Sequence, residues 1–228
     1  EDHFNELVID LVNPAGQPER MQLVVRGYND GFAFCYKIPD GKGPCVNVQS
    51  ELTAYNFAGD YTAWFYNGEN HNIGPEKLTE TDGTRLPVMT VKAGDKHYMA
   101  IHEACLETGA PLVLQSKGGE SLFSVASKPT SLSPGYTSAW RVVLYGTTPG
   151  VLTDSHLLEL LNPDPDSRYD FSWVKPGLAV WDWRINGAVW DGFTYGMSYP
   201  SWVRMVDFAA EQGFKYLVCL LYTSDAAD

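Results

Sequence analysis

With 228 residues and 44% hydrophobic side chains, the chain is long enough to bury one large domain, or one domain and part of a second. The formal charge of −12 argues against a nucleic-acid partner, because phosphates are bound by Lys and Arg. The sequence has no apolar run long enough to span a membrane. Aromatic residues at 13% suit a β-rich protein whose surface meets neutral sugars, although aromatic strands also build ordinary sandwich cores.

The first two thirds of the chain have the pattern of short β-strands separated by turn residues. Residues 7–12 form one apolar run, and residues 21–38 divide at Asn29-Asp30-Gly31, a sequence typical of hairpin turns. Further strands are predicted at Thr62–Tyr66, Leu86–Val91, His97–His102, Pro111–Leu114 and Trp140–Tyr145. This all-β pattern predicts an antiparallel β-sandwich over residues 1–161.

The pattern changes after residue 150. Thr153 or Asp154 can cap a short helix in which Leu157, Leu158 and Leu161 share one side. Because Pro and Asp dominate the sequence that follows, we expect residues 162–176 to be a connector.

Beyond the connector, a strand–helix–strand order is predicted. Residues 178–183 form a buried strand, Ser201–Gln212 has helical spacing of apolar residues, Gly213 stops the helix, and Phe214–Leu221 is an apolar strand. This is one βαβ unit, the element of a parallel sheet or of a (β/α)₈ barrel, and we assign it to residues 177–218.

The four cysteines form neither a CxxC pair nor a zinc-type pattern with histidine. A bridge between Cys35 and Cys45 and unpaired buried thiols both remain open at this stage.

Several motifs lie along the chain in a fixed order. They are His3-Phe4-Asn5-Glu6-Leu7, residues 28–34, residues 57–64, residues 98–104 (Tyr-Met-Ala-Ile-His-Glu-Ala), residues 139–143 (Ala-Trp-Arg-Val-Val), residues 173–177, residues 181–184 (Trp-Asp-Trp-Arg) and residues 206–211. Together they resemble glycoside hydrolase family 97, a calcium-dependent family of α-glucosidases and α-galactosidases, and the resemblance extends to about residue 218.

The resemblance implies an N-terminal β-supersandwich, a catalytic (β/α)₈ barrel and a small C-terminal β-domain. By that pattern the chain is a fragment that lacks the first sandwich strands and most of the barrel. It also implies a bacterial, periplasmic or secreted protein whose signal peptide lies outside this sequence. Residues 219–228 depart from the family pattern and resemble translated adapter sequence, so we assign them to a non-native tail.

Glu103 is the candidate metal ligand. It falls in the same strand phase as Met99 and Ile101, and a carboxylate in an apolar phase needs a compensating charge. Calcium takes six to eight hard oxygen ligands and is one such compensation. The resemblance implies that Glu103 reaches the barrel mouth and joins barrel carboxylates around calcium. The alternative is a turn carboxylate that pairs with Lys or with solvent, and one carboxylate alone should bind calcium weakly.

The candidate substrate-binding residues are Trp181, Asp182, Trp183 and Arg184, because active sites of barrel enzymes lie at the C-terminal ends of the strands. Trp183 would stack on a sugar and Asp182 would accept hydrogen bonds from hydroxyls. Core packing with a structural Asp–Arg pair is the alternative. No catalytic residue is assigned, because the family carries its two catalytic carboxylates on later strands.

Two hypotheses of function follow. In the first, the parent protein cleaves terminal α-linked glucose, or galactose, from oligosaccharides with calcium as cofactor, while the fragment itself is inactive. In the second, the chain is a non-catalytic carbohydrate-binding β-sandwich. Whether the protein is a monomer or a homodimer is not determined by the sequence.

Overall fold

The computed structural model describes residues 3–12, 15, 18–66, 68 and 72–219. The chain divides into two compact units, Glu1–Asp164 and Pro165–Asp228. The division falls inside residues 162–176, the segment predicted as a connector. Apart from Cys219, the predicted tail lies outside the described residues.

β-strands are the main regular elements of the first unit. Its elements are β1 Asn5–Val12, β2 Pro18–Tyr28, β3 Gly31–Lys37, β4 Val46–Val48, β5 Ala54–Asn56, β6 Thr62–Tyr66, β7 Ile73–Lys77, the 3₁₀ turn Leu78–Glu80, β8 Asp82–Lys92, β9 Tyr98–Ala104, β10 Leu114–Lys117, β11 Leu122–Val125, β12 Thr130–Leu132, β13 Trp140–Gly146, α1 Pro149–Asp154 and α2 Leu157–Leu160.

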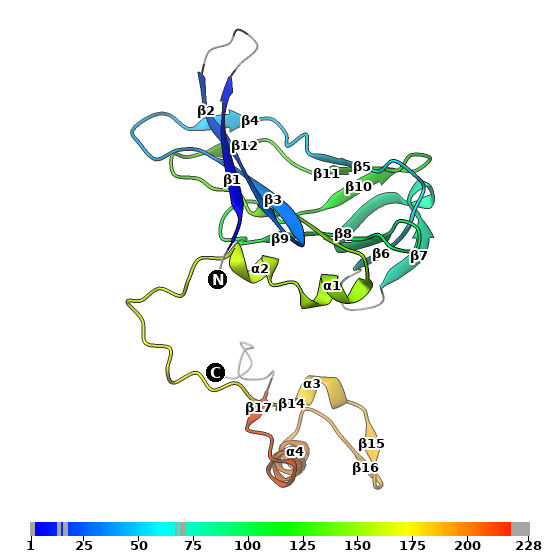
Figure 1. Cartoon of the computed structure of the whole chain (residues 1–228). Coiled ribbons are helices and arrows are strands. Elements are labelled where there is room, and N and C mark those ends of the chain that lie inside the picture. The colour runs from blue at the N-terminus through cyan, green and yellow to red at the C-terminus, as the bar shows by residue number, and fades with distance from the viewer. Residues whose placement is uncertain (1–2, 13–14, 16–17, 67, 69–71, 220–228) are drawn as a thin grey trace. The chain divides into compact units, whose positions relative to one another are not determined.

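Antiparallel pairing connects most of these strands in the order β1-β2-β3-β13-β9-β8-β10-β11-β5, with β6 and β7 branching from β8. Strand β8 joins the two layers, because residues 82–85 pair with β10 whereas residues 89–92 pair with β9. The sheet thereby folds over on itself into a β-sandwich (Figure 1). The predicted antiparallel β-sandwich is confirmed.

The main core lies between the two layers. Met89 of β8 and Ile101 of β9 are directly opposite each other, and both are fully buried. The rings of Phe65 and Phe123, from β6 and β11, lie 5.7 Å apart between centroids. Such contacts exclude water between the layers and account for much of the stability of a sandwich.

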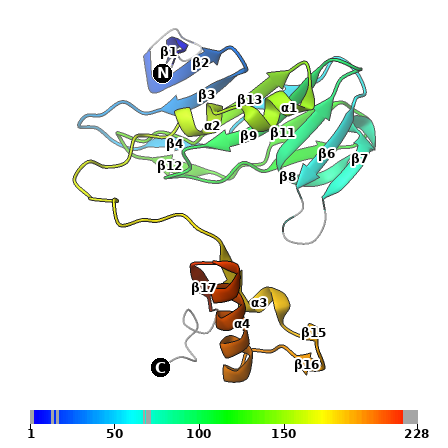
Figure 2. The ribbon, with the colours of Figure 1, turned by 60° about the horizontal axis from the view of Figure 1, so that its bottom comes forward.

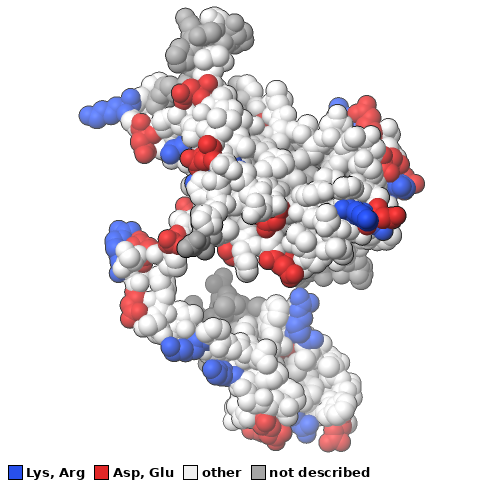
Figure 3. Space-filling view, viewed as in Figure 1, with Lys and Arg blue, Asp and Glu red and all other residues white. Residues whose placement is uncertain are grey.

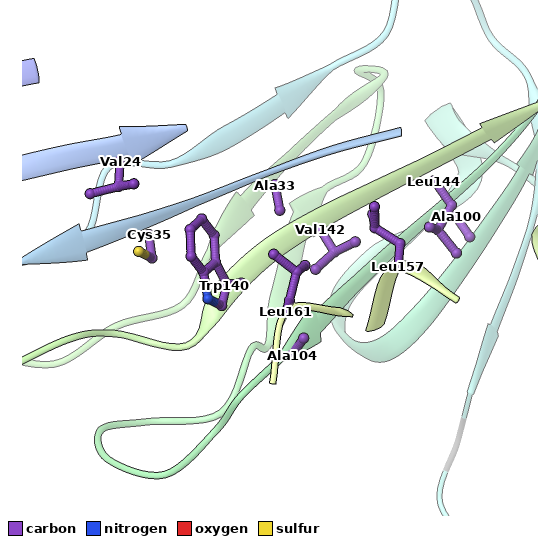
Figure 4. Close-up of a cluster of buried hydrophobic side chains, with 10 residues drawn as sticks. All are labelled: Val24, Ala33, Cys35, Ala100, Ala104, Trp140, Val142, Leu144, Leu157 and Leu161. Atoms are coloured by element: carbon purple, nitrogen blue, oxygen red, sulfur yellow. The ribbon is translucent and has the colours of Figure 1, made fainter. Parts of the chain in front are cut away.

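A second cluster lies on the other face of β3, β13 and β9, beneath the two short helices (Figure 2). Leu157 and Leu161 point into it from the α2 region, towards Val142 and Ala104 on the strands (Figure 4). Strands β9 and β13 are therefore covered on both faces, which explains why their sequences are almost continuously apolar.

Two local predictions in this unit are wrong, and each has a physical reason. Residues 111–113 are not part of a strand, and β10 begins at Leu114, because the amide of Leu112 donates to the carboxylate of Glu103 instead of to a neighbouring strand. Thr153 and Asp154 end helix α1 and do not cap α2. At the start of α2, the hydroxyl of Ser155 accepts a hydrogen bond from the backbone amide of Leu157 instead.

The second unit contains β14 Ala179–Trp181, α3 Asp182–Ile185, β15 Val189–Trp190, β16 Phe193–Thr194, α4 Tyr199–Gln212 and β17 Tyr216–Val218. Strands β14 and β17 pair in parallel on either side of α4 in the sequence, as a βαβ unit requires. Gly213 ends α4 with a φ of 72°, as predicted. The predicted strand 178–183 is shorter than expected, because Asp182 already begins a helix.

The hairpin β15–β16 is a feature that the sequence reasoning missed. Its turn is Asp191-Gly192, with φ values of 50° and 71°, and this dipeptide is a strong hairpin signal. The flanking strands have only two residues each, too few for an alternating pattern to stand out.

No helix in the described part of the chain is long and apolar enough to cross a membrane. On the face shown in Figure 3, Lys and Arg lie scattered and do not gather into one basic patch.

All four cysteines are free, so the structure contains no Cys35–Cys45 bridge. Cys35 is buried in the same cluster as Val24 and Trp140, and burial raises the pKa of its thiol to about 11. Cys45 is exposed.

Replacing Leu157 with Ala should destabilise the first unit by about 2–5 kcal/mol, because the leucine is fully buried and its loss leaves a cavity above β9 and β13. The matched control is Leu160→Ala on the exposed side of the same helix, expected to cost less than about 1 kcal/mol. Native-state hydrogen exchange of the β9 and β13 amides measures the loss of stability in each of the two variants. Equal effects of the two substitutions would mean that the helices do not stabilise the sheet.

At pH 8, iodoacetamide should label Cys45 rapidly and leave Cys35 unlabelled until urea is added, because the thiolate of Cys35 is both buried and rarely formed. Mass spectrometry of tryptic peptides gives the labelling rate at each site. A Cys35–Cys45 disulfide in a non-reduced digest would contradict the structure.

Candidate functional site

Glu103 lies near the end of β9, directly opposite Arg141 of β13. Directly opposed residues of antiparallel strands place their side chains on the same face of the sheet. On this face of β9, Ile101 is part of the inter-layer core and Met99 packs against it. The inward phase predicted for Glu103 is therefore the one that the structure has.

The carboxylate of Glu103 is held by two N–H donors on one oxygen. Its Oε2 accepts a hydrogen bond of 2.8 Å from the backbone amide of Leu112 and one of 3.3 Å from Nη1 of Arg141. Its Oε1 takes part in none of the hydrogen bonds or ion pairs among the described residues. The side chain is 12% exposed, so it does not point into open water.

Arg141 also binds a second carboxylate through two parallel hydrogen bonds. Its Nε lies 3.0 Å from Oε1 of Glu51, and its Nη2 lies 2.7 Å from Oε2. The side chains of Arg141 and Glu51 are only 5% and 16% exposed. Such a bidentate pair is among the strongest charge-assisted contacts in proteins, and here it ties the loop before β5 to the sheet.

Burial by itself lowers the pKa of Arg141, but the hydrogen bond and charge of Glu51, together with the charge of Glu103, outweigh it and raise the pKa of the guanidinium above its ordinary value. Arg141 is thus a permanent cation that faces two carboxylates. Burial also raises the pKa of the neighbouring Tyr55 phenol, which stays neutral. The cluster of Glu51, Glu103 and Arg141, called the carboxylate clamp below, joins two carboxylates to one guanidinium and so has an excess of negative charge when charges are counted formally.

A large hollow lies against the clamp. Its volume is about 1210 Å³, and its lining includes Glu51 and Arg141 together with Tyr36, Tyr136 and Leu52. Glu103 does not line it. The hollow is larger than an ordinary ligand pocket, and two of the charged residues on its wall, Glu51 and Arg141, already bind each other.

Among the described residues, no group of three or more His, Cys, Asp or Glu side chains is arranged to hold a metal ion. Glu103 nevertheless offers what calcium prefers: a hard carboxylate oxygen without another partner, in a cluster with excess negative charge. The clamp therefore fits calcium as a source of one ligand.

The other four candidate residues lie in the second unit, around the end of β14. Asp182 is 1% exposed, and its Oδ2 accepts a hydrogen bond of 3.1 Å from the indole of Trp202 in α4. Trp183 is 49% exposed, which leaves its ring available for stacking. The guanidinium of Arg184 lies 5.1 Å from the ring centroid of Trp181, a cation–π distance. Asp182 thus has a structural contact, whereas Trp183 has an accessible ring.

Sequence reasoning missed Glu51, Arg141 and Trp202. Arg141 gave a usable signal, because it interrupts the apolar strand Trp140–Gly146 and a buried cation requires a carboxylate partner. Glu51 gave none, since it lies in a loop 90 residues from the guanidinium that it binds.

The chain matches the family model described as Glycosyl-hydrolase 97 N-terminal over residues 1–163. This match covers most of the chain, and the chain belongs to glycoside hydrolase family 97.

Two relatives are similar over most of the chain. A "Retaining alpha-galactosidase" of Bacteroides thetaiotaomicron is 28% identical over 85% of this chain and 35% of its own length. A "Probable retaining alpha-galactosidase" of Streptomyces bingchenggensis is 29% identical over 87% of this chain and 31% of its own length. The chain thus spans about a third of each relative.

The solved structures agree with this assignment. A glycoside hydrolase family 97 enzyme from Pseudoalteromonas sp. strain K8, in complex with acarbose, superimposes with a TM-score of 0.73 at 25% identity, over 95% of this chain and 35% of that one. A variant of the same enzyme has been solved in complex with panose.

Substituting Arg141 with Met should destabilise the first unit by about 3–5 kcal/mol, because two largely buried carboxylates lose their counter-charge. The control is Lys117→Met on β10, an exposed cation without an ion pair among the described residues, expected to change stability by less than about 0.5 kcal/mol. Urea unfolding followed by circular dichroism compares the two. A cost for Arg141→Met as small as that of the control would show that the clamp does not stabilise the fold.

Proposed function

We propose that this chain is the N-terminal part of an exo-acting glycoside hydrolase that removes terminal α-linked galactose from oligosaccharides. The observation that carries the proposal is its similarity, over most of its length, to two relatives named as retaining α-galactosidases. Because the chain spans only about a third of those relatives, the activity belongs to a longer protein that contains it.

Terminal α-linked glucose is the second candidate substrate. It is favoured by the Pseudoalteromonas enzyme, which is similar in structure and has been solved with acarbose and with panose, a trisaccharide of glucose. Glucose and galactose differ only in the orientation of one hydroxyl group. The choice therefore depends on a few hydrogen bonds in the sugar pocket.

The βαβ unit of the second unit is proposed as the opening of the catalytic (β/α)₈ barrel. Strands β14 and β17 are parallel, and in barrel enzymes the active site lies at the C-terminal ends of such strands. Trp183 follows the end of β14 and is the candidate platform for a sugar ring. Trp181 and Arg184 would line the same mouth. Asp182 remains a predicted acceptor for sugar hydroxyls, although its bond to Trp202 also fixes α4 against the strand end.

Calcium is proposed as the cofactor, with Glu103 as the ligand that this chain contributes. The excess negative charge of the carboxylate clamp supports this, as does the oxygen of Glu103 that has no other partner. When bound, calcium would supply fixed positive charge at the carboxylate of Glu103. The other ligands would come from outside the described residues.

A carbohydrate-binding sandwich without catalysis is the rival function. The βαβ unit and the length of the relatives disfavour it, because a binding module has no need of a barrel. Glycoside hydrolysis needs two carboxylates, and we propose that both lie on barrel strands outside this chain. A bacterial periplasmic or secreted location belongs to the same proposal.

The decisive measurement compares the full-length protein with residues 1–228 alone, using p-nitrophenyl α-galactoside and p-nitrophenyl α-glucoside. The full-length protein should hydrolyse one of them with a preference of at least tenfold, and residues 1–228 should hydrolyse neither. Glucose preference would select the second candidate. Turnover by residues 1–228, or none by the full-length protein on either substrate, would overturn the proposal.

A further inference from the structure

We propose that Arg141 is a positioning residue for Glu103, and that Glu51 neutralises Arg141 so that Glu103 keeps its negative charge for a divalent cation. The inference rests on the proposed calcium role of Glu103. It adds two residues that act on the metal only through that carboxylate.

The hydrogen-bond geometry of the carboxylate is the first support. Both N–H donors, from Leu112 and Arg141, bind Oε2 of Glu103 and leave Oε1 without a partner among the described residues. Two donors from different segments restrict rotation of the carboxylate. Ligands held in this way by outer partners bind metals more tightly, because less freedom is lost when the ion arrives.

The charge balance of the clamp is the second support. An arginine paired with Glu103 alone would cancel its charge, and a cation would gain little by binding there. Glu51 removes this difficulty, because it takes Nε and Nη2 of Arg141 in the shorter, bidentate contact and leaves Nη1 for Glu103. The guanidinium can therefore orient Glu103 while the cluster as a whole remains negative.

The rival explanation is that the clamp only joins the layers of the sandwich. Both explanations predict that substitutions lower stability. They differ in calcium affinity: a clamp that only joins the layers would leave the affinity of the folded protein unchanged, whereas a positioning clamp would not.

The experiment measures calcium binding to the metal-free full-length protein by isothermal titration calorimetry, with thermal unfolding of the metal-free form measured in parallel. Arg141→Lys keeps the charge but loses the planar fork that binds both carboxylates. Glu51→Gln keeps the shape but removes the neutralising charge. Each variant should weaken calcium binding by about 10- to 100-fold.

Arg85→Lys is the matched control. Arg85 pairs with a different carboxylate, Glu76, and both side chains are largely buried in the same unit. This substitution should lower the unfolding temperature of the metal-free protein yet change calcium affinity by less than about twofold.

Glu103→Gln separates the inference from the function beneath it. Loss of calcium binding in Glu103→Gln, with unchanged affinity in Arg141→Lys and Glu51→Gln, would overturn the positioning role and leave the metal proposal intact. Unchanged affinity in Glu103→Gln would overturn both. If Arg141→Lys fails to fold, Glu51→Gln decides by the same criterion.

Discussion

The sandwich depends on a cation buried between its layers. Arg141 extends from β13 towards the other layer and is buried, so without its partners its charge would cost several kcal/mol. Its two partners come from positions 90 and 38 residues away in the chain. Only one register of β9 against β13 places Glu103 opposite it, and a slip by one residue would turn every side chain to the other face. The charge contacts and the hydrophobic pattern therefore select the same register.

Strands β9 and β13 are packed on both faces, and this limits where chemistry can occur. One face packs against the inter-layer core, and the other packs beneath α1 and α2. Near the end of β9, the loop through Leu112 donates to Glu103. Packing on both faces restricts movement of the strand that carries Glu103.

The second unit shows a similar use of one polar contact. Asp182 lies where β14 ends and α3 begins, and its bond to Trp202 connects that point to α4. The contact fixes the strand end from which Trp183 projects. Among the four consecutive positions proposed for binding, Asp182 is thus the one whose side chain also contacts α4.

The sequence by itself determined the elements whose signals are local: the hairpin at Asn29-Asp30-Gly31, the stop at Gly213, and the inward phase of Glu103. These features depend on the backbone preferences of single residues and on the alternation of side chains along a strand, and both can be read from a few neighbouring residues. Only the tertiary structure decided that Arg141 and Glu51 complete the environment of Glu103. It also decided that Leu112 lies in a loop, where its backbone amide donates to the Glu103 carboxylate. Those contacts join segments that are far apart in the chain. Strand register and the path of the loops decide which segments meet, and no short stretch of sequence determines either of them alone.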